Sequence, residues 1–253
     1  MSKRQEVRAK RRRQRMVNRI TIIGLVVVGA LLIALALILP GINNANQKAT
    51  QMANLTAVPV VTIVPRTFPV PTDRNTIGDP TAPIKIDVWE DFQCSACLNF
   101  SKNTEPLIIQ NYVNTGKVYY VFHFFPAISS YSPGNTESEH AANASLCAAD
   151  QGKFWEYHDI LFANWNGENQ GAYVDTRLIA FAESIGLTMK DFKSCLNSDK
   201  YGSFISQDFT AGQNQGVSGT PSVFVNNGII GKLGYVPSYQ EISGVIEAIL
   251  AGK

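Results

Sequence analysis

Residues 84–97 of the chain have the sequence Ile-Lys-Ile-Asp-Val-Trp-Glu-Asp-Phe-Gln-Cys-Ser-Ala-Cys. The first part, from Ile84 to Trp89, has the apolar content of a β-strand with a buried face. The cysteines Cys94 and Cys97 follow where a helix is expected to begin. There the unpaired N–H groups and the positive end of the helix dipole favour a reactive thiolate at Cys94. Two cysteines three residues apart can also close a disulfide, so this stretch predicts redox chemistry on sulfur.

The charge of the chain is divided sharply near its N-terminus. The 253 residues carry a formal charge of +2, but residues 1–19 hold nine Lys/Arg and one acid, leaving 13 basic and 19 acidic residues elsewhere. Residues 20–39 carry no charge and match a bilayer core of about 30 Å. A basic cluster directly before a span stays in the cytoplasm. We therefore expect a cytoplasmic tail over 1–19, a transmembrane helix over 20–39 and an extracytoplasmic remainder.

A cleaved signal peptide is the alternative to a retained anchor. The apolar segment is longer than the usual core of a signal peptide, and Ala45 is only a weak cleavage point. We therefore predict a single-pass protein of the cell membrane with its N-terminus in the cytoplasm. The basic run also fits nucleic-acid binding by composition, but its place before the apolar segment favours the topological interpretation, and no nucleic-acid partner is expected.

All four cysteines follow the expected span, in a compartment where disulfides persist. Cys94, Cys97, Cys147 and Cys195 allow three pairings. We favour Cys94 with Cys97 as a reactive local pair and Cys147 with Cys195 as a structural bond, with a second redox pair as the alternative for the latter. A zinc site is disfavoured because the remaining cysteines and histidines form no paired motif. We expect neither a metal nor a cofactor.

Residues 40–75 are predicted to be an extracytoplasmic linker, first polar and then rich in proline. A folded domain is expected over 76–253. It begins with the strand at 84–89, a helix over 95–113 that Pro106 should kink or break, and an apolar strand over 118–125. Two strands joined by a helix of this length predict a β-α-β crossover and a parallel strand pair.

In the second half of the domain, helices and strands are expected to alternate less regularly. A block of helices is expected over about 136–215. A short strand follows at 222–225, and Asn226-Asn227-Gly228 is a strong hairpin turn signal before a second strand at 229–232. A closing helix over 238–250 has its apolar residues on one face. The fold class is therefore α/β.

This order of elements resembles the thioredoxin-like fold with an inserted helical domain. Residues 76–251 resemble the DsbA-like thiol:disulfide oxidoreductases of the membrane-anchored bacterial kind. The matching stretches are Gly78-Asp79-Pro80, Asp91-Phe92-Gln93-Cys94 with Cys97, Gly152-Lys153-Phe154-Trp155-Glu156-Tyr157-His158, and Gly219-Thr220-Pro221-Ser222. The resemblance implies a cis peptide bond between Thr220 and Pro221 beside the cysteine pair. It also implies a structural disulfide within the inserted helices, which fits Cys147 and Cys195.

The resemblance further implies an enzyme that introduces disulfide bonds into exported proteins. Cys94 would be the attacked cysteine and Cys97 its buried partner, while Thr220 and Pro221 would offer backbone groups to an extended substrate segment. The implied partners are unfolded or reduced exported proteins. The implied re-oxidant is a membrane quinone reductase of the DsbB or vitamin-K-epoxide-reductase type.

The chain departs from the family pattern at two places. Ser95-Ala96 stands where strong oxidants have Pro-His, and Val88 stands where an acid often assists proton transfer to the buried cysteine. Glu90 or Asp91 are the candidates to replace that acid, although Asp91 also fits a cap of the active-site turn. A reductase or isomerase, and a non-catalytic thioredoxin-like binding module or holdase, remain the alternative functions.

Overall fold

The computed structural model describes the folded part of the chain over residues 59–226, 228–230 and 235–252. Nearer the N-terminus it describes residues 13, 14, 16, 19, 21, 23–30, 33–37 and 39. The chain divides into two units, Met1–Asn54 and Leu55–Lys253, and every described strand belongs to the second.

The expected transmembrane helix over 20–39 lies partly outside the described residues, and the expected tail over 1–19 lies mostly outside them. Among the residues that are described, no helix has the length and apolar content that crossing a bilayer requires. The tail and the span therefore stay predictions from the sequence. Residues 40–58 of the expected linker also lie outside the described part.

Residues 59–75, part of the linker that their proline content predicts, form hydrogen bonds and ion pairs with the folded unit. Val61 exchanges two backbone hydrogen bonds with the side-chain amide of Asn164, at 2.8 and 2.9 Å. Arg66 forms ion pairs with two acidic side chains of the folded unit, at 2.6 and 2.5 Å. An extended proline-rich segment has no internal hydrogen bonds, so its polar groups are free to pair with a neighbouring surface. The folded unit therefore begins well before residue 76.

In the described part of the chain, six strands form one sheet in the order β1-β2-β4-β3-β5-β6. Their bounds are Thr72–Asp73, Thr76–Ile77, Ile84–Glu90, Val118–Phe124, Ser222–Val225 and Gly228–Ile230. The central strand β3 is parallel to β4 and antiparallel to β5. The parallel pair and the β5–β6 hairpin predicted from the sequence are both present.

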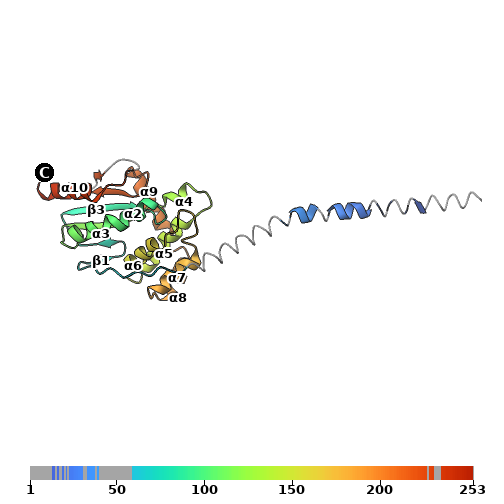
Figure 1. Ribbon diagram of the computed structural model, residues 1–253, viewed down its shortest axis with the longest axis horizontal. Helices are drawn as coiled ribbons and strands as arrows, with labels where there is room; N and C mark the ends of the chain where they lie inside the picture. The colour runs from blue at the N-terminus through green and yellow to red at the C-terminus, as the bar shows by residue number, and fades with distance from the viewer. Residues whose placement is uncertain are drawn as a thin grey trace, which may run out of the picture. The chain divides into compact units, whose positions relative to one another are not determined.

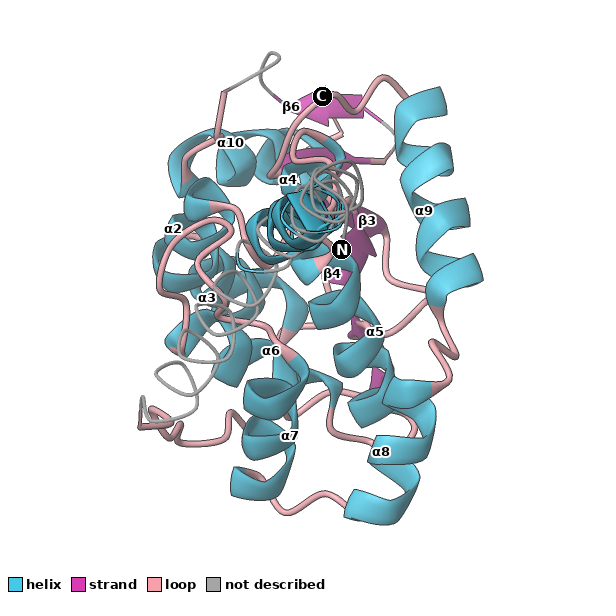
Figure 2. Ribbon diagram, turned by 90° about the vertical axis from the view of Figure 1, so that its right-hand side faces the viewer, coloured by secondary structure: helices cyan, strands magenta, loops and turns pink. Residues whose placement is uncertain are grey.

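Helices cover both faces of this sheet. Their bounds are α2 Ser95–Asn103, α3 Glu105–Ile108, α4 Ala127–Ser130, α5 Glu137–Ala149, α6 Phe154–Ala163, α7 Asp175–Ser184, α8 Met189–Asn197, α9 Gly202–Asn214 and α10 Tyr239–Leu250. Helices α7 and α8 lie at the opposite end of the folded unit from α10 (Figure 1). Figure 2 shows α9 on one side of β3 and β4, with α2 and α3 on the other. The helices α5 to α9 fall between β4 and β5, which confirms a thioredoxin-like α/β fold with added helices.

The helix expected over 95–113 is divided. α2 ends at Asn103, α3 begins at Glu105, and a π-helical turn continues over Ile109–Val113. Pro106 lies in the first turn of α3, where its missing N–H removes no helical hydrogen bond. The new helix start leaves Glu105 completely buried, at 0% exposure.

The side chains of β3 alternate between two environments, as expected for a strand. Ile86 and Val88 belong to the main apolar core, whereas Trp89 packs in a smaller cluster with Phe224. Glu90 is two residues beyond Val88 and therefore points to the main core, on the side of α2 and α3. It is 1% exposed there. This alternation brings an acid to the same face of the sheet as the cysteine pair.

Candidate active site

A short turn, Asp91 to Cys94, connects β3 to α2 and holds the cysteine pair in place. The Asp91 carboxylate accepts hydrogen bonds from the backbone N–H groups of Gln93 and Ile128 at 2.9 and 2.8 Å, and from the Ser138 hydroxyl at 3.0 Å. The Cys94 N–H donates to the Asp91 carbonyl at 3.0 Å. Burial raises the pKa of Asp91 to about 7, although these hydrogen bonds oppose the shift. With its carboxylate bonded to the turn, Asp91 acts as a cap.

Cys94 is the N-cap residue of α2 and is 8% exposed, whereas Cys97 is fully buried. Both are free thiols in the structure. The Cys97 thiol makes the largest contribution to lowering the pKa of Cys94 to about 6. Burial opposes this shift, and the Thr220 side chain and the N–H groups of Cys97 and Ala96 reinforce it. These groups stabilise the Cys94 thiolate without a histidine between the two cysteines.

Cys97 has the opposite properties. Burial is the largest cause that raises its pKa well above the ordinary value, followed by its contact with Cys94 and the nearby charge of Glu90. The Asp91 N–H donates to Cys97 Sγ at 3.5 Å, which only partly offsets that rise. The pair is therefore asymmetric, with a reactive thiolate at Cys94 and a protonated thiol at Cys97.

The peptide bond between Thr220 and Pro221 is cis and lies beside the pair. The Cys94 thiol donates to the Thr220 carbonyl oxygen at 3.4 Å, across 126 residues of sequence. Strand β5 begins immediately afterwards, at Ser222. The structure thus brings together Cys94, Cys97, Thr220 and Pro221 at one end of the central strands.

Glu90 faces Cys97 from the end of β3. Neither of its carboxylate oxygens has a hydrogen-bond partner. Burial raises the pKa of Glu90 well above its ordinary value, the charge of Glu105 adds to this rise, and interaction with the Cys97 thiol opposes it. Of the two acids that the sequence offered, Glu90 therefore lies next to the reacting sulfur atoms, and Asp91 serves the turn.

A loop between α6 and α7 contacts the residues on either side of Cys94, and the sequence did not indicate it. The Gln93 carbonyl accepts a hydrogen bond from Trp165 Nε1 at 2.7 Å, and the Gln93 side-chain oxygen accepts one from the Asn169 N–H at 2.7 Å. Glu168 accepts weaker bonds from the N–H and hydroxyl of Ser95, at 3.4 and 3.3 Å. These residues follow no motif, and only the folded chain brings them to the start of α2.

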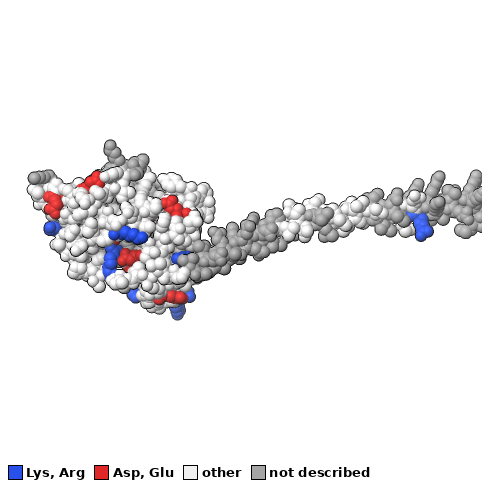
Figure 3. All heavy atoms as spheres, viewed as in Figure 1, with Lys and Arg blue, Asp and Glu red and all other residues white. Residues whose placement is uncertain are grey.

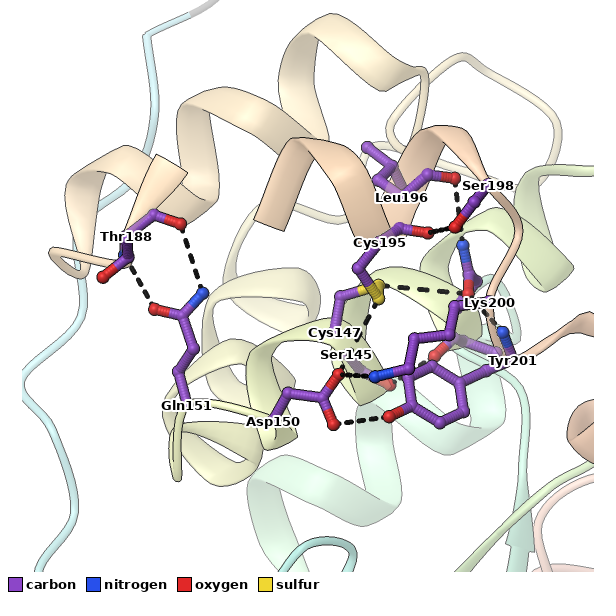
Figure 4. Close-up of a disulfide and its surroundings, with 12 residues drawn as sticks. Ser145, Cys147, Asp150, Gln151, Thr188, Cys195, Leu196, Ser198, Lys200 and Tyr201 are labelled. Atoms are coloured by element: carbon purple, nitrogen blue, oxygen red, sulfur yellow. Dashed lines mark hydrogen bonds and ion pairs between the residues drawn. A yellow bond between two sulfur atoms is a disulfide. The ribbon is translucent and has the colours of Figure 1, made fainter. Parts of the chain in front are cut away.

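The other two cysteines form a disulfide well separated in sequence from the reactive pair. Cys147 of α5 and Cys195 of α8 are joined with an S–S distance of 2.01 Å. Figure 4 shows Asp150 close to this bond, with Lys200 and Tyr201 directed at its carboxylate. Cys147 is 1% exposed and Cys195 is 8% exposed. The bond ties two of the inserted helices together.

Charged side chains are few on the face of the folded unit shown in Figure 3, and basic and acidic side chains lie close together there.

The low pKa of Cys94 predicts the pH dependence of its alkylation. Because only the thiolate reacts, alkylation of the reduced full chain by iodoacetamide should have a midpoint near pH 6. An ordinary cysteine would have its midpoint near pH 8.5. The folded pKa is the lower one, so ionisation of Cys94 stabilises the reduced protein. That stabilisation is complete above the unfolded pKa and is lost as the pH falls through about 6.

The Cys97→Ala variant is the matched test of this assignment. It removes the largest contribution to the low pKa of Cys94, so the alkylation midpoint should move upward. A midpoint near pH 8.5 in the unmodified chain would contradict the predicted environment of Cys94.

Comparison with known proteins extends these observations. The family model described as Thioredoxin matches residues 69–248. The structure of DsbA from Chlamydia trachomatis aligns with a TM-score of 0.59 and 26% identity, over 75% of this chain and 99% of that one. The resemblance to DsbA-like proteins stated from the sequence is thereby confirmed.

Two curated relatives have different names. "Probable disulfide bond formation protein D" from Bacillus cereus is 25% identical over 62% of this chain and 71% of its own length. "Na(+)/H(+) antiporter NhaA 3" from Salinispora tropica is 32% identical over 65% of this chain, but the match spans only 23% of the antiporter. The matched region thus covers less than a quarter of that longer relative.

Proposed function

The chain belongs to the thioredoxin family, and on that premise we propose that it is a thiol:disulfide oxidoreductase that introduces disulfide bonds into exported proteins. The observation that carries this proposal is that the pKa values of two adjacent thiols are shifted in opposite directions. The pKa of Cys94 is lowered to about 6, and that of Cys97 is raised well above its ordinary value. The name of the Bacillus cereus relative supports the same chemistry.

The proposed reaction starts from the Cys94–Cys97 disulfide. A substrate thiolate attacks Cys94 Sγ and forms a mixed disulfide, and Cys97 leaves as a thiolate that takes a proton from the adjacent Glu90 carboxyl. A second substrate thiolate attacks the substrate sulfur of the mixed disulfide and releases Cys94 as a thiolate. The substrate gains one disulfide by losing two electrons, and the enzyme gains them as two reduced cysteines. Thr220 and Pro221 line the place where the substrate segment would bind.

The pKa of Cys94 also supports the oxidising direction. A thiol with a low pKa is a good leaving group, and a stabilised thiolate favours the reduced enzyme as the product. The groups that provide this stabilisation are the Cys97 thiol, the Thr220 side chain and two N–H groups of α2. We therefore propose an oxidant, with a Cys94 thiolate less stabilised than that of DsbA, whose pKa is about 3.5, as Ser95-Ala96 in place of Pro-His leads one to expect.

The proposed compartment and partners follow from the sequence. A basic tail before an apolar segment supports a catalytic domain outside the cytoplasm, held at the membrane by its own anchor. The substrates would be unfolded or reduced exported proteins. A membrane quinone reductase of the DsbB or vitamin-K-epoxide-reductase type would return the enzyme to its disulfide form.

The redox potential of the full chain tests the direction of the reaction. Equilibration with glutathione buffers should give a potential more positive than about −200 mV, toward the values of known oxidants. A potential near −270 mV, the value for thioredoxin, would favour the reductase or isomerase alternative instead. If the oxidised chain fails to oxidise a reduced, unfolded dithiol protein, a binding module or holdase becomes the better interpretation.

A further inference from the structure

A group of buried charged side chains lies behind Cys97, on the face of β3 that carries Glu90. Glu105 is the first residue of α3, and His158 belongs to α6. A carboxylate oxygen of Glu90, one of Glu105 and a ring nitrogen of His158 all lie within 4.8 Å of one another. Glu105 and His158 are each 0% exposed. Three proton-accepting side chains thus meet in the core, directly behind the buried thiol.

Half of the buried polar side-chain atoms without a hydrogen bond, among the described residues, belong to this group. Eight buried side-chain atoms of the described residues have no hydrogen-bond partner, and they include both Glu90 oxygens, Glu105 Oε2 and His158 Nε2. The Tyr120 hydroxyl is another of these eight atoms, and the charges of Glu105 and Glu90 act on it. An unpaired buried polar atom costs about 1–3 kcal/mol. Glu105 Oε2 and His158 Nε2 meet only each other, as an ion pair at 3.4 Å, and the Glu90 oxygens accept no hydrogen bond by distance and angle, so the cluster keeps acceptor positions open for protons.

The outer end of the group reaches the surface at Asp159. His158 Nδ1 lies 2.9 Å from Asp159 Oδ1, so the N–H there donates to the carboxylate. That assignment leaves Nε2 as the nitrogen facing Glu105, 3.4 Å from its Oε2. The Asp159 side chain is 17% exposed. The cluster therefore connects a buried carboxyl to solvent through the two nitrogens of one imidazole ring.

Arg66 fixes the geometry of this connection. Its guanidinium donates to Glu105 Oε1 at 2.6 Å and to the two Asp159 oxygens at 2.5 and 2.7 Å. Burial alone would raise the pKa of Asp159, but its bonds to His158 and Arg66 lower it. Arg66 also supplies the positive charge that a cation would otherwise provide to Glu105, which favours proton transfer over metal binding at these side chains.

We propose that His158 and Glu105 carry protons between Asp159 at the surface and Glu90, so that Cys97 can gain or lose its proton without direct access to solvent. This proposal rests on the proposed function. The ring of His158 starts doubly protonated, with Nδ1–H toward Asp159 and Nε2–H toward Glu105. When Cys97 takes the Glu90 proton, Nε2 gives its proton to Glu105 Oε2, and Glu105 passes a proton to Glu90. The ring then keeps only its Nδ1 proton, and turning the ring over presents its free nitrogen to Asp159, where solvent returns the lost proton. The reverse order removes the Cys97 proton during re-oxidation, and a small side-chain rotation closes the remaining distances.

The relay can be measured with a small disulfide in place of a protein substrate. In the reduced full chain, the Cys94 thiolate attacks oxidised glutathione and releases one glutathione thiolate. Cys97 must then lose its proton, attack Cys94 Sγ and release the second glutathione thiolate. Acid quenching and mass spectrometry count the mixed disulfide and the closed Cys94–Cys97 form. Only the second step depends on the relay.

The Glu105→Gln and His158→Gln variants should close the disulfide at least about 10-fold more slowly and accumulate the mixed disulfide, because assisted proton transfer contributes about 10²–10⁴ in rate. Their closure rates should also rise with pH, as hydroxide replaces the relay. The rate of Cys94 alkylation should stay within about twofold of that of the unmodified chain, which would show that the site is folded.

Two further variants serve as controls. Glu105→Asp keeps an ionisable group and should recover part of the closure rate. Glu139→Gln changes a carboxylate outside the cluster whose Oε2 also has no hydrogen bond, and it should have no effect.

The titratable and charged groups around Glu90 are Cys94 and Cys97 of α2, Glu105 of α3, Tyr120 of β4, His158 and Asp159 of α6, Arg66, and the adjacent Asp91.

Closure at the unmodified rate in both Gln variants would overturn the relay. If those variants do not fold, the closure rate of the unmodified chain is compared in H₂O and D₂O. Proton transfer through the relay should make closure about twofold or more slower in D₂O. Equal rates in the two solvents would contradict the relay. Loss of closure on adding a chelator would assign the three side chains to a metal and also overturn the relay. Normal closure with glutathione but no oxidation of a protein substrate would count against the proposed function alone.

Discussion

Replacing Cys94 with serine should abolish oxidation of an unfolded dithiol substrate, lowering the rate by about a thousandfold or more. A serine hydroxyl forms no disulfide, so the oxidised form of the active site cannot exist in the variant. Cys97 cannot take over the attack, because it is 0% exposed and its pKa lies well above the ordinary value. The measurement is the appearance of disulfides in a reduced, unfolded protein mixed with the full chain.

Cys97→Ser is the matched control for this prediction. It keeps Cys94, the more accessible cysteine, which should still attack the disulfide of an oxidised substrate, but Cys97 can no longer attack the mixed disulfide that forms. A mixed disulfide between Cys94 and the substrate should therefore accumulate and be visible on a non-reducing gel. Oxidation by Cys94→Ser at the unmodified rate would refute the enzymatic function and leave a binding role.

The reacting groups could be predicted from short stretches of sequence, because local rules determine them. Cys94 and Cys97 stand at a strand-to-helix junction, and the Thr220-Pro221 pair precedes a strand. Strand alternation also determines the position of Glu90, since an acid two residues after Val88 must share its buried face. The sequence could not decide between Glu90 and Asp91, because the choice depends on Ser138 and Ile128, which donate hydrogen bonds to Asp91 and not to Glu90.

The surroundings of these groups depend on contacts between distant segments, which no local pattern encodes. Arg66 lies in a segment whose prolines predict a linker, yet it pairs with Glu105 and Asp159, 39 and 93 residues away. The burial of Glu105 follows from the break between α2 and α3, and the sequence predicted only that Pro106 would kink or break the helix there. Glu168 reaches Ser95 through a loop with no motif. The pairing of charges behind Cys97 therefore becomes visible only in the folded chain.

The disulfide between Cys147 and Cys195 should contribute about 4 kcal/mol to the free energy of unfolding. The bond closes a loop with a sequence separation of 48, and the chain-entropy model gives about this value for such a loop. The double variant Cys147→Ala/Cys195→Ala releases α5 from α8, and the hydrogen bonds of Asp150 to Lys200 and Tyr201 remain as the main local polar ties. Urea unfolding followed by tryptophan fluorescence measures the loss.

The same double variant separates a structural bond from a second redox pair. If the bond is structural, the variant should be less stable but should keep the Cys94–Cys97 potential and the rate of substrate oxidation at a temperature where it is folded. The reactive pair lies on α2, and Cys147 and Cys195 are on α5 and α8, so the electronic environment of Cys94 should not change. Full stability together with loss of oxidation would contradict the structural role. In that case electrons would have to pass through Cys147 and Cys195, and the asymmetry of Cys94 and Cys97 would explain only part of the reaction.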